Sequence, residues 1–244
     1  MAGNIYFHLI ILVAGFTQGF TGFGSALIML PLLTLLLGVK TVVPMVILLG
    51  LCINVILFLQ IRRHLEWKRV RILFAASVPG IFCGVYILKT MSTGFLELAI
   101  GMVLIVFPGY LMSRSVPERE VAPVWAWPVG FLSGVLGGSV SAGGPPVIIY
   151  VAMQPWGKLS IKSTLVGFFL ITSVAIGAVQ AAGGLMTREV LALFAAGLPA
   201  LVTGVLAGSY LFDRIDSVAY RKVLNVLLIL LGVFMLGKAV VGGW

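Results

Sequence analysis

Long apolar runs separated by short polar loops occupy nearly the whole chain. Five runs precede a polar loop at 113–120, and five follow it. The first five cover about 5–22, 23–37, 41–61, 70–89 and 94–112, and the second five about 122–137, 144–156, 162–183, 189–211 and 217–240. Because a spanning helix needs ~20 apolar residues, this pattern predicts an all-α polytopic membrane protein. A transmembrane barrel would instead show ~10-residue segments of alternating polarity.

The first two runs of each half are shorter than the rest. At ~1.5 Å per residue, runs of about 12 to 18 residues cover less than the ~30 Å of a hydrocarbon core. Glycine clusters and prolines also interrupt these runs. We therefore expect each short pair to form half-helices or a re-entrant hairpin around a glycine-rich break.

Composition supports the same class. The chain has 244 residues, of which 61% are hydrophobic and 9% are charged. Its mean hydropathy is +1.18, which is more apolar than a soluble core requires. The net charge of +9 would also suit a nucleic-acid partner, but the basic residues lie in short loops between the apolar runs. That placement favours membrane orientation over nucleic-acid binding.

One stretch of the chain occurs twice. Gly15 to Pro31 and Gly130 to Pro146 share glycine, phenylalanine and proline at a constant offset of 115, and residues 70–84 match 190–204 at an offset of 120. We infer an internal duplication, with a first repeat at 1–112, a linker at 113–121 and a second repeat at 122–244, in a single integral membrane domain. Such duplications are typical of transporters whose substrate site lies between the halves.

The distribution of Lys and Arg predicts how the two repeats are oriented. If each short pair enters and leaves on one side, or crosses twice, one side carries 12 of the 16 basic residues; if each pair crosses once, the split is 9 to 7. The positive-inside rule favours the first arrangement, in which the repeats are inverted and both termini lie outside. The twelve cytoplasmic residues are then Arg62, Arg63, Lys68, Arg69, Arg71, Arg114, Arg119, Lys158, Lys162, Arg214, Arg221 and Lys222.

Candidate substrate-binding residues come from the two glycine-rich motifs and from the third segment of each half. In hydrocarbon, irregular backbone persists only where protein or a water-filled cavity surrounds it. Glycine permits the turn, and the free N–H groups at the start of the following half-helix suit an anion. Hydroxyl and amide side chains add neutral donors, so a small oxyanion would need no buried cation. The predicted set is Gln18, Thr21, Gly22, Gly24, Ser25, Asn54, Gly137, Gly138, Ser139, Ser141, Gly143, Gly144 and Ser173.

Other roles compete for some of these positions. Asn54 and Ser173 would serve equally well in hydrogen bonds between helices. Glycines outside the motifs are expected to let helices pack closely, namely Gly80, Gly84, Gly204 and Gly208. The sequence has no H-E-x-x-H, no Ser/His/Asp grouping and no Cys/His metal spacing, so we expect no enzyme, metal site or cofactor.

The paired motifs resemble the TauE/SafE family of membrane permeases. The likeness rests on 19–24 with Pro31 and on 130–138 with 143–146, and it covers essentially the whole chain. It implies a secondary transporter in a bacterial inner (plasma) membrane that exports sulfite or an organosulfonate such as sulfoacetate. The expected partners are a small anion, the lipid bilayer and, as one option, a second copy of the chain. Transport or exchange of another small anion or metabolite, and a non-transport subunit of a membrane complex, are the alternatives.

Overall fold

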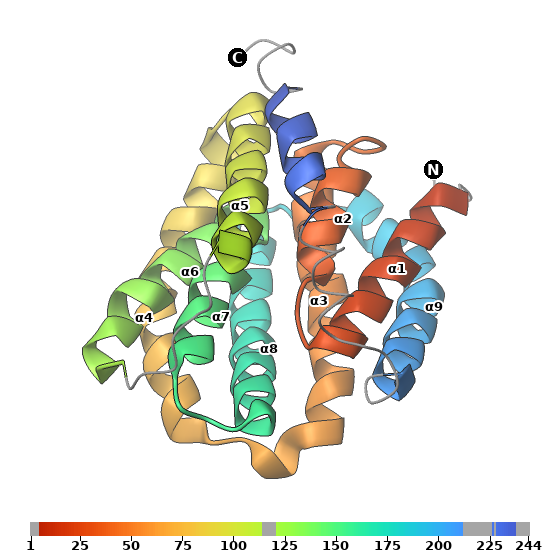
Figure 1. Cartoon of the computed structure of the whole chain (residues 1–244). Helices are drawn as coiled ribbons and strands as arrows, with labels where there is room; N and C mark the ends of the chain where they lie inside the picture. The colour runs from red at the N-terminus through yellow and green to blue at the C-terminus, as the bar shows by residue number, and fades with distance from the viewer. Residues whose placement is uncertain (1–4, 114–120, 212–225, 227, 238–244) are drawn as a thin grey trace.

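A computed structural model describes residues 5–113, 121–211, 226 and 228–237, and all regular structure in them is helical (Figure 1). The predicted all-α class is confirmed for this part of the chain. The elements are α1 (Ile5–Thr21), α2 (Ser25–Leu33), α3 (Val39–Ile61), η1 (Arg62–His64), α4 (Trp67–Thr90), α5 (Thr93–Ser113), η2 (Pro123–Trp125), α6 (Ala126–Val140), α7 (Gly144–Met153), α8 (Lys158–Ala182) and α9 (Arg188–Leu211). A further helix covers Leu228–Gly237, so the predicted segment at 217–240 lies partly outside the described residues.

Five helices in the described residues are long and apolar enough to cross a membrane, namely α3, α4, α5, α8 and α9. The first two helices of each half are shorter, as predicted. Helix α2 has 9 residues and α7 has 10, which corresponds to about 15 Å, half the thickness of a hydrocarbon core. Apolar side chains such as Phe82, Val106 and Leu206 are exposed on the outer surface, as expected for helices that face lipid.

Each short pair forms a hairpin, and the two hairpins point in opposite directions. In Figure 1, α1 and α2 open toward the end of the molecule at which the N-terminus lies, whereas α6 and α7 open toward the other end. The first hairpin turns at 22–24 and the second at 141–143. Gly22, Gly24 and Ser141 have φ values of 86°, 101° and 53° there. Glycine adopts this left-handed region without the steric cost that a Cβ imposes.

The two halves are interlocked through their short helices. Helix α1 packs along α9, and α6 packs along α4. In both pairs the backbones touch: a Cβ added to Gly15 would lie 2.8 Å from the carbonyl oxygen of Leu201, and one added to Gly138 would lie 2.7 Å from that of Ile81. A Cβ on the four glycines predicted to mediate packing would clash with a carbonyl oxygen of the partner helix, which confirms that role for Gly80, Gly84, Gly204 and Gly208.

Residues that occupy equivalent places in the two halves are four positions further apart in the chain than the sequence matches indicate, which is about one helical turn. The left-handed residues Gly22 and Ser141 are 119 positions apart, not 115. The packing glycines of α4 and α9 that make equivalent contacts are 124 positions apart, not 120, because Gly80 meets the carbonyl of Phe131 and Gly204 that of Leu12. Glycines recur every four residues in these helices. An alignment of the two halves by sequence therefore matches glycine with glycine equally well when one half is shifted by four residues, or one turn.

Basic side chains gather at one end of the molecule, which we call the basic end. They lie where α3 ends and α4 begins, beside the start of α8 in Figure 1, and comprise Arg62, Arg63, Lys68, Arg69 and Arg71. The opposite end, where α3 and α9 begin, carries Lys40, Lys89 and Arg188. Six basic residues used in the charge comparison lie outside the described residues, namely Arg114, Arg119, Arg214, Arg221, Lys222 and Lys238.

Candidate functional site

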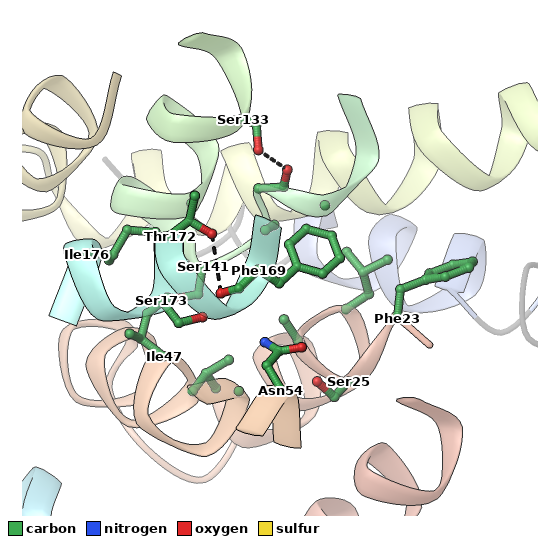
Figure 2. A pocket seen from close by; sticks show the side chains of 18 of the residues that line it. Phe23, Ser25, Ile47, Asn54, Ser133, Ser141, Phe169, Thr172, Ser173 and Ile176 are labelled. Atoms are coloured by element: carbon green, nitrogen blue, oxygen red, sulfur yellow. Dashed lines mark hydrogen bonds between the residues drawn. The ribbon is translucent and has the colours of Figure 1, made fainter. Parts of the chain in front are cut away.

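A cavity of about 90 Å³ lies between the two hairpin turns and the middle of α3 and α8 (Figure 2). A water molecule needs ~10–15 Å³ of such space, so the cavity has room for several waters or one small anion. Nine of the thirteen predicted site residues line it, and they come from both halves of the chain. These nine are Gln18, Gly24, Ser25, Asn54, Gly137, Ser141, Gly143, Gly144 and Ser173.

A chain of buried hydrogen bonds joins the first hairpin to α3. Gln18 Nε2 donates to Asn54 Oδ1 over 3.1 Å, and Ser25 Oγ donates to Gln18 Oε1. Asn54 is only 3% exposed. Because its carbonyl oxygen is held by Gln18, its Nδ2 group faces the cavity, where no acceptor meets it among the described residues (Figure 2). Asn54 is therefore a hydrogen-bond donor oriented toward the cavity.

The start of α2 adds backbone donors to the same cavity. The helix begins after Gly24, and no side chain in the described part of the chain caps it. The first N–H groups of a helix have no partner within it, and here they belong to Ser25, Ala26 and Leu27, all of which line the cavity. Helix α7 also starts uncapped, after Gly143. Its second and third residues are prolines, which lack an N–H, so the first motif offers more backbone donors than the second.

A comparison with known protein families identifies the family of the chain. A family model described as Sulfite exporter TauE/SafE matches residues 7–235. The chain belongs to this family. No curated protein and no solved structure matches it. Membership makes this TauE/SafE protein a membrane transporter of the sulfite and anion exporter class rather than an enzyme.

In this TauE/SafE protein the hydroxyls of the second motif hold the turn together. Ser133 Oγ donates to the carbonyl oxygen of Gly143, which joins α6 to the start of α7 (Figure 2). Ser141 Oγ donates to Val43 O over 2.9 Å and so ties the hairpin turn to α3. Ser133 lines the cavity but was not predicted. Its spacing of four residues before Gly137, on the same helical face, is the signal that could have identified it.

Helix α8 supplies the remaining hydroxyls. Thr172 Oγ1 donates to Phe168 O within the same helix over 2.7 Å (Figure 2). The Ser173 hydroxyl, in contrast, has no hydrogen-bond partner among the described residues, and the residue is 7% exposed. Figure 2 shows Ser173 and Asn54 facing the same space from α8 and α3. Two side-chain donors, one from each half, are thus available to a ligand.

Four predicted residues lie away from the cavity. Thr21 stabilises the end of α1 and the turn after it, since its Oγ1 donates to Thr17 O over 2.8 Å and accepts from Phe23 N over 3.2 Å. Ser139 Oγ donates to Val135 O over 2.6 Å, within its own helix. Gly22 and Gly138 are in contact with other helices.

These two glycines make different contacts. Gly22 lies beneath the side chain of Lys162, whose Cγ is 3.2 Å from the position that a Cβ would take. Gly138 packs against α4, where a Cβ would meet Ile81 O and Val85 N. The structure therefore places Gly138 in a helix–helix contact and Gly22 at a turn covered by a basic residue of α8.

The cavity lining carries no Asp, Glu, Lys or Arg among the described residues. Its polar groups are amides, hydroxyls and backbone N–H groups, and its walls are apolar. The apolar residues comprise Phe23, Ala26, Leu27, Val46, Ile47, Ala142, Pro145, Ile148, Phe168, Phe169 and Ile176. Sequence reasoning missed these positions because nearly every residue around them is apolar too.

Proposed function

We propose that this protein is a secondary transporter that exports a small sulfur oxyanion or an organosulfonate, such as sulfite or sulfoacetate, and that the cavity between the hairpin turns binds the anion near the membrane midplane. The observation that carries the proposal is the convergence of neutral donors on one cavity. Asn54 Nδ2 and the Ser173 hydroxyl come from opposite halves of the chain. The uncapped start of α2 adds three backbone N–H groups.

This set of donors favours an anion over a cation or an apolar ligand. Backbone N–H groups at a helix start carry the positive end of the helix dipole, and they bind oxyanions in many proteins. Hydrogen bonds to a charged acceptor are stronger than those to a neutral one. No carboxylate of the described residues lines the cavity, so no anionic side chain in this part of the chain would repel a negative ligand there. A volume of about 90 Å³ suits a small ligand.

We infer the orientation of the protein from its basic end and the direction of transport from the membrane potential. The basic end carries Arg62, Arg63, Lys68, Arg69 and Arg71, so the positive-inside rule places it in the cytoplasm. The two repeats are then inverted, and each hairpin enters the membrane from a different side. An inside-negative potential favours the exit of an anion by ~2.3 kcal/mol per charge per 100 mV. Export is therefore energetically possible without a coupling ion.

Flux measurements on purified protein in liposomes test this proposal. Liposomes loaded with radiolabelled sulfite or sulfoacetate should release the label faster with the protein than without it. The variant Asn54→Leu should slow the release. Ser139→Ala should not, because that hydroxyl bonds only to its own helix in the described residues. If a panel of small anions shows no protein-dependent flux in either direction, the transporter proposal fails. Flux of a different anion alone would reassign the substrate.

A further inference from the structure

A completely buried glutamine lies in α8 beyond the cavity. Gln180 is 0% exposed, and neither its Nε2 nor its Oε1 has a hydrogen-bond partner among the residues that the structure describes. Buried amide groups in folded proteins almost always have partners, so an unpaired one calls for an explanation. Inside a membrane the requirement is stricter, because no lipid tail supplies a hydrogen bond.

Gln180 follows the cavity along one face of α8. Ser173, Ile176 and Gln180 are spaced by three and four residues, so their side chains share that face. Ser173 and Ile176 line the cavity, whereas Gln180 does not. Gln180 therefore lies one turn further toward the opposite end of the molecule, beyond Ile176.

An apolar cluster separates the cavity from Gln180. Ile47 of α3, Ile81 and Val85 of α4 and Ile176 of α8 form a cluster distinct from the main core, and we call these four residues the apolar plug. Each is at most 7% exposed. Ile47 and Ile176 lie at one end of the cavity in Figure 2, and both also line it. The plug thus closes the cavity on the side of the opposite end.

Two lysines follow on the far side of Gln180. A Cβ added to Gly183, three residues after Gln180, would lie 3.4 Å from Cδ of Lys89. Lys40 Nζ donates to the carbonyl oxygen of Lys89 over 3.3 Å, and both lysines are exposed. From the cavity to the surface, the hydroxyl of Ser173 is therefore followed by the apolar plug, then by the unpaired amide of Gln180, and last by the two exposed lysines.

We propose that the apolar plug is the gate on this side and that Gln180 is a second anion-contacting residue, which hydrogen-bonds the ion after the gate opens. This inference rests on the proposed function, since it extends the path of the same anion. An apolar constriction excludes water and ions while it is closed. The amide of Gln180 then has no partner, and it gains one from water or the passing anion when the plug residues separate. Lys40 and Lys89 then attract the anion toward the surface at the opposite end.

Accessibility to a thiol reagent tests the gate without reference to flux. In a background of Cys52→Ala and Cys83→Ala, the variants Ser173→Cys and Gln180→Cys are treated with a membrane-impermeant sulfonate-bearing methanethiosulfonate, in right-side-out and in inverted vesicles. Because residue 180 is buried, Gln180→Cys should react slowly and from the side of the opposite end, whereas Ser173→Cys should react only from the basic end. Adding Ile47→Ala and Ile176→Ala should expose Ser173→Cys to both sides. A plug is excluded if Ser173→Cys reacts equally from both sides without these changes, or if Gln180→Cys reacts faster from the basic end than from the opposite end.

Transport by apolar variants tests the role of the amide. Gln180→Leu keeps the size of the side chain but removes the donor, so efflux should fall at least about fivefold while equilibrium anion binding is unchanged. Gln60→Leu is the matched control, because Gln60 is exposed at the end of α3, and it should transport normally. If wild-type protein transports and Gln180→Leu does so equally fast, this inference alone is wrong. If wild-type protein transports nothing, the proposed function is wrong, while the labelling result still decides whether the plug closes the cavity.

Discussion

The substitution Asn54→Asp places a negative charge in the proposed anion site with almost no change in shape. A carboxylate retains the oxygen that accepts the hydrogen bond from Gln18 Nε2, which is 3.1 Å long in the native protein. It replaces the Nδ2 donor, which faces the cavity, with a second acceptor. The hydrogen bonds that hold the first hairpin against α3 are therefore preserved, and the main perturbation is electrostatic.

The size of the cavity sets the magnitude of the effect. A volume of about 90 Å³ corresponds to a sphere of roughly 3 Å radius, so a bound anion would lie about 5 Å from the introduced carboxylate. Two like charges at that separation repel by about 3 kcal/mol at an effective dielectric constant of ~20. Loss of the amide donor to a charged ligand adds about 1.5 kcal/mol or more. Together these terms weaken binding by more than about a thousandfold.

Binding and efflux of an alkylsulfonate across a range of pH provide the assay. The sulfonate stays ionised throughout, so only the introduced carboxyl changes charge. Affinity of the Asn54→Asp variant should recover as the pH falls into the acidic range in which carboxyl groups take up a proton. Asn54→Leu lacks both donor and charge, so it should lose only the hydrogen-bond contribution and show no such recovery. Thermal unfolding in detergent checks that both variants are folded.

Two results would refute this reasoning. If Asn54→Asp binds the anion as tightly as wild type at neutral pH, the ligand does not lie beside Asn54. If Asn54→Asp and Asn54→Leu lose the same affinity at every pH, a charge at this position does not affect anion binding, and the anion binds elsewhere.

Four further substitutions test the packing and the first turn. Gly84→Ala would push a Cβ into the carbonyl of Val135. The free energy of unfolding should therefore fall by about 1–3 kcal/mol, and the variant should unfold in detergent at a lower temperature than wild type. At Gly109, an added Cβ would meet nothing within 4 Å among the described residues, so Gly109→Ala should be neutral or slightly stabilising. Gly22→Ala forces a Cβ onto a residue with φ of 86°, which should cost about 1–2 kcal/mol and reduce flux, whereas normal stability and flux would show that the turn relaxes. Ser25→Ala leaves a buried amide oxygen of α1 without its donor, so anion affinity should fall about tenfold in a direct binding measurement; unchanged affinity would show that this hydroxyl does not order the site.

Much of the candidate site could be predicted because the membrane restricts what a glycine-rich break can be. Irregular backbone in hydrocarbon must be surrounded by protein or by a cavity, so polar residues next to the two breaks were expected to share a site. Gln18, Ser25 and Ser141 do line one cavity. The same reasoning did not separate these residues from Gly138 and Ser139. Gly138 packs against α4, and the Ser139 hydroxyl donates to a carbonyl of its own helix.

By itself, the sequence determined the helical class, the short paired segments and the turns at the two breaks, because these depend on hydrophobicity and backbone geometry within a single segment. Only the tertiary structure decided the correspondence between the halves, since the four-residue glycine spacing permits two registers that differ by one turn. It also decided which apolar side chains became the plug and which amide was left unpaired. Ile176 and Gln180 have these positions because α8 meets α3 and α4 there, and a contact between helices far apart in the chain is not encoded in the local pattern of either one.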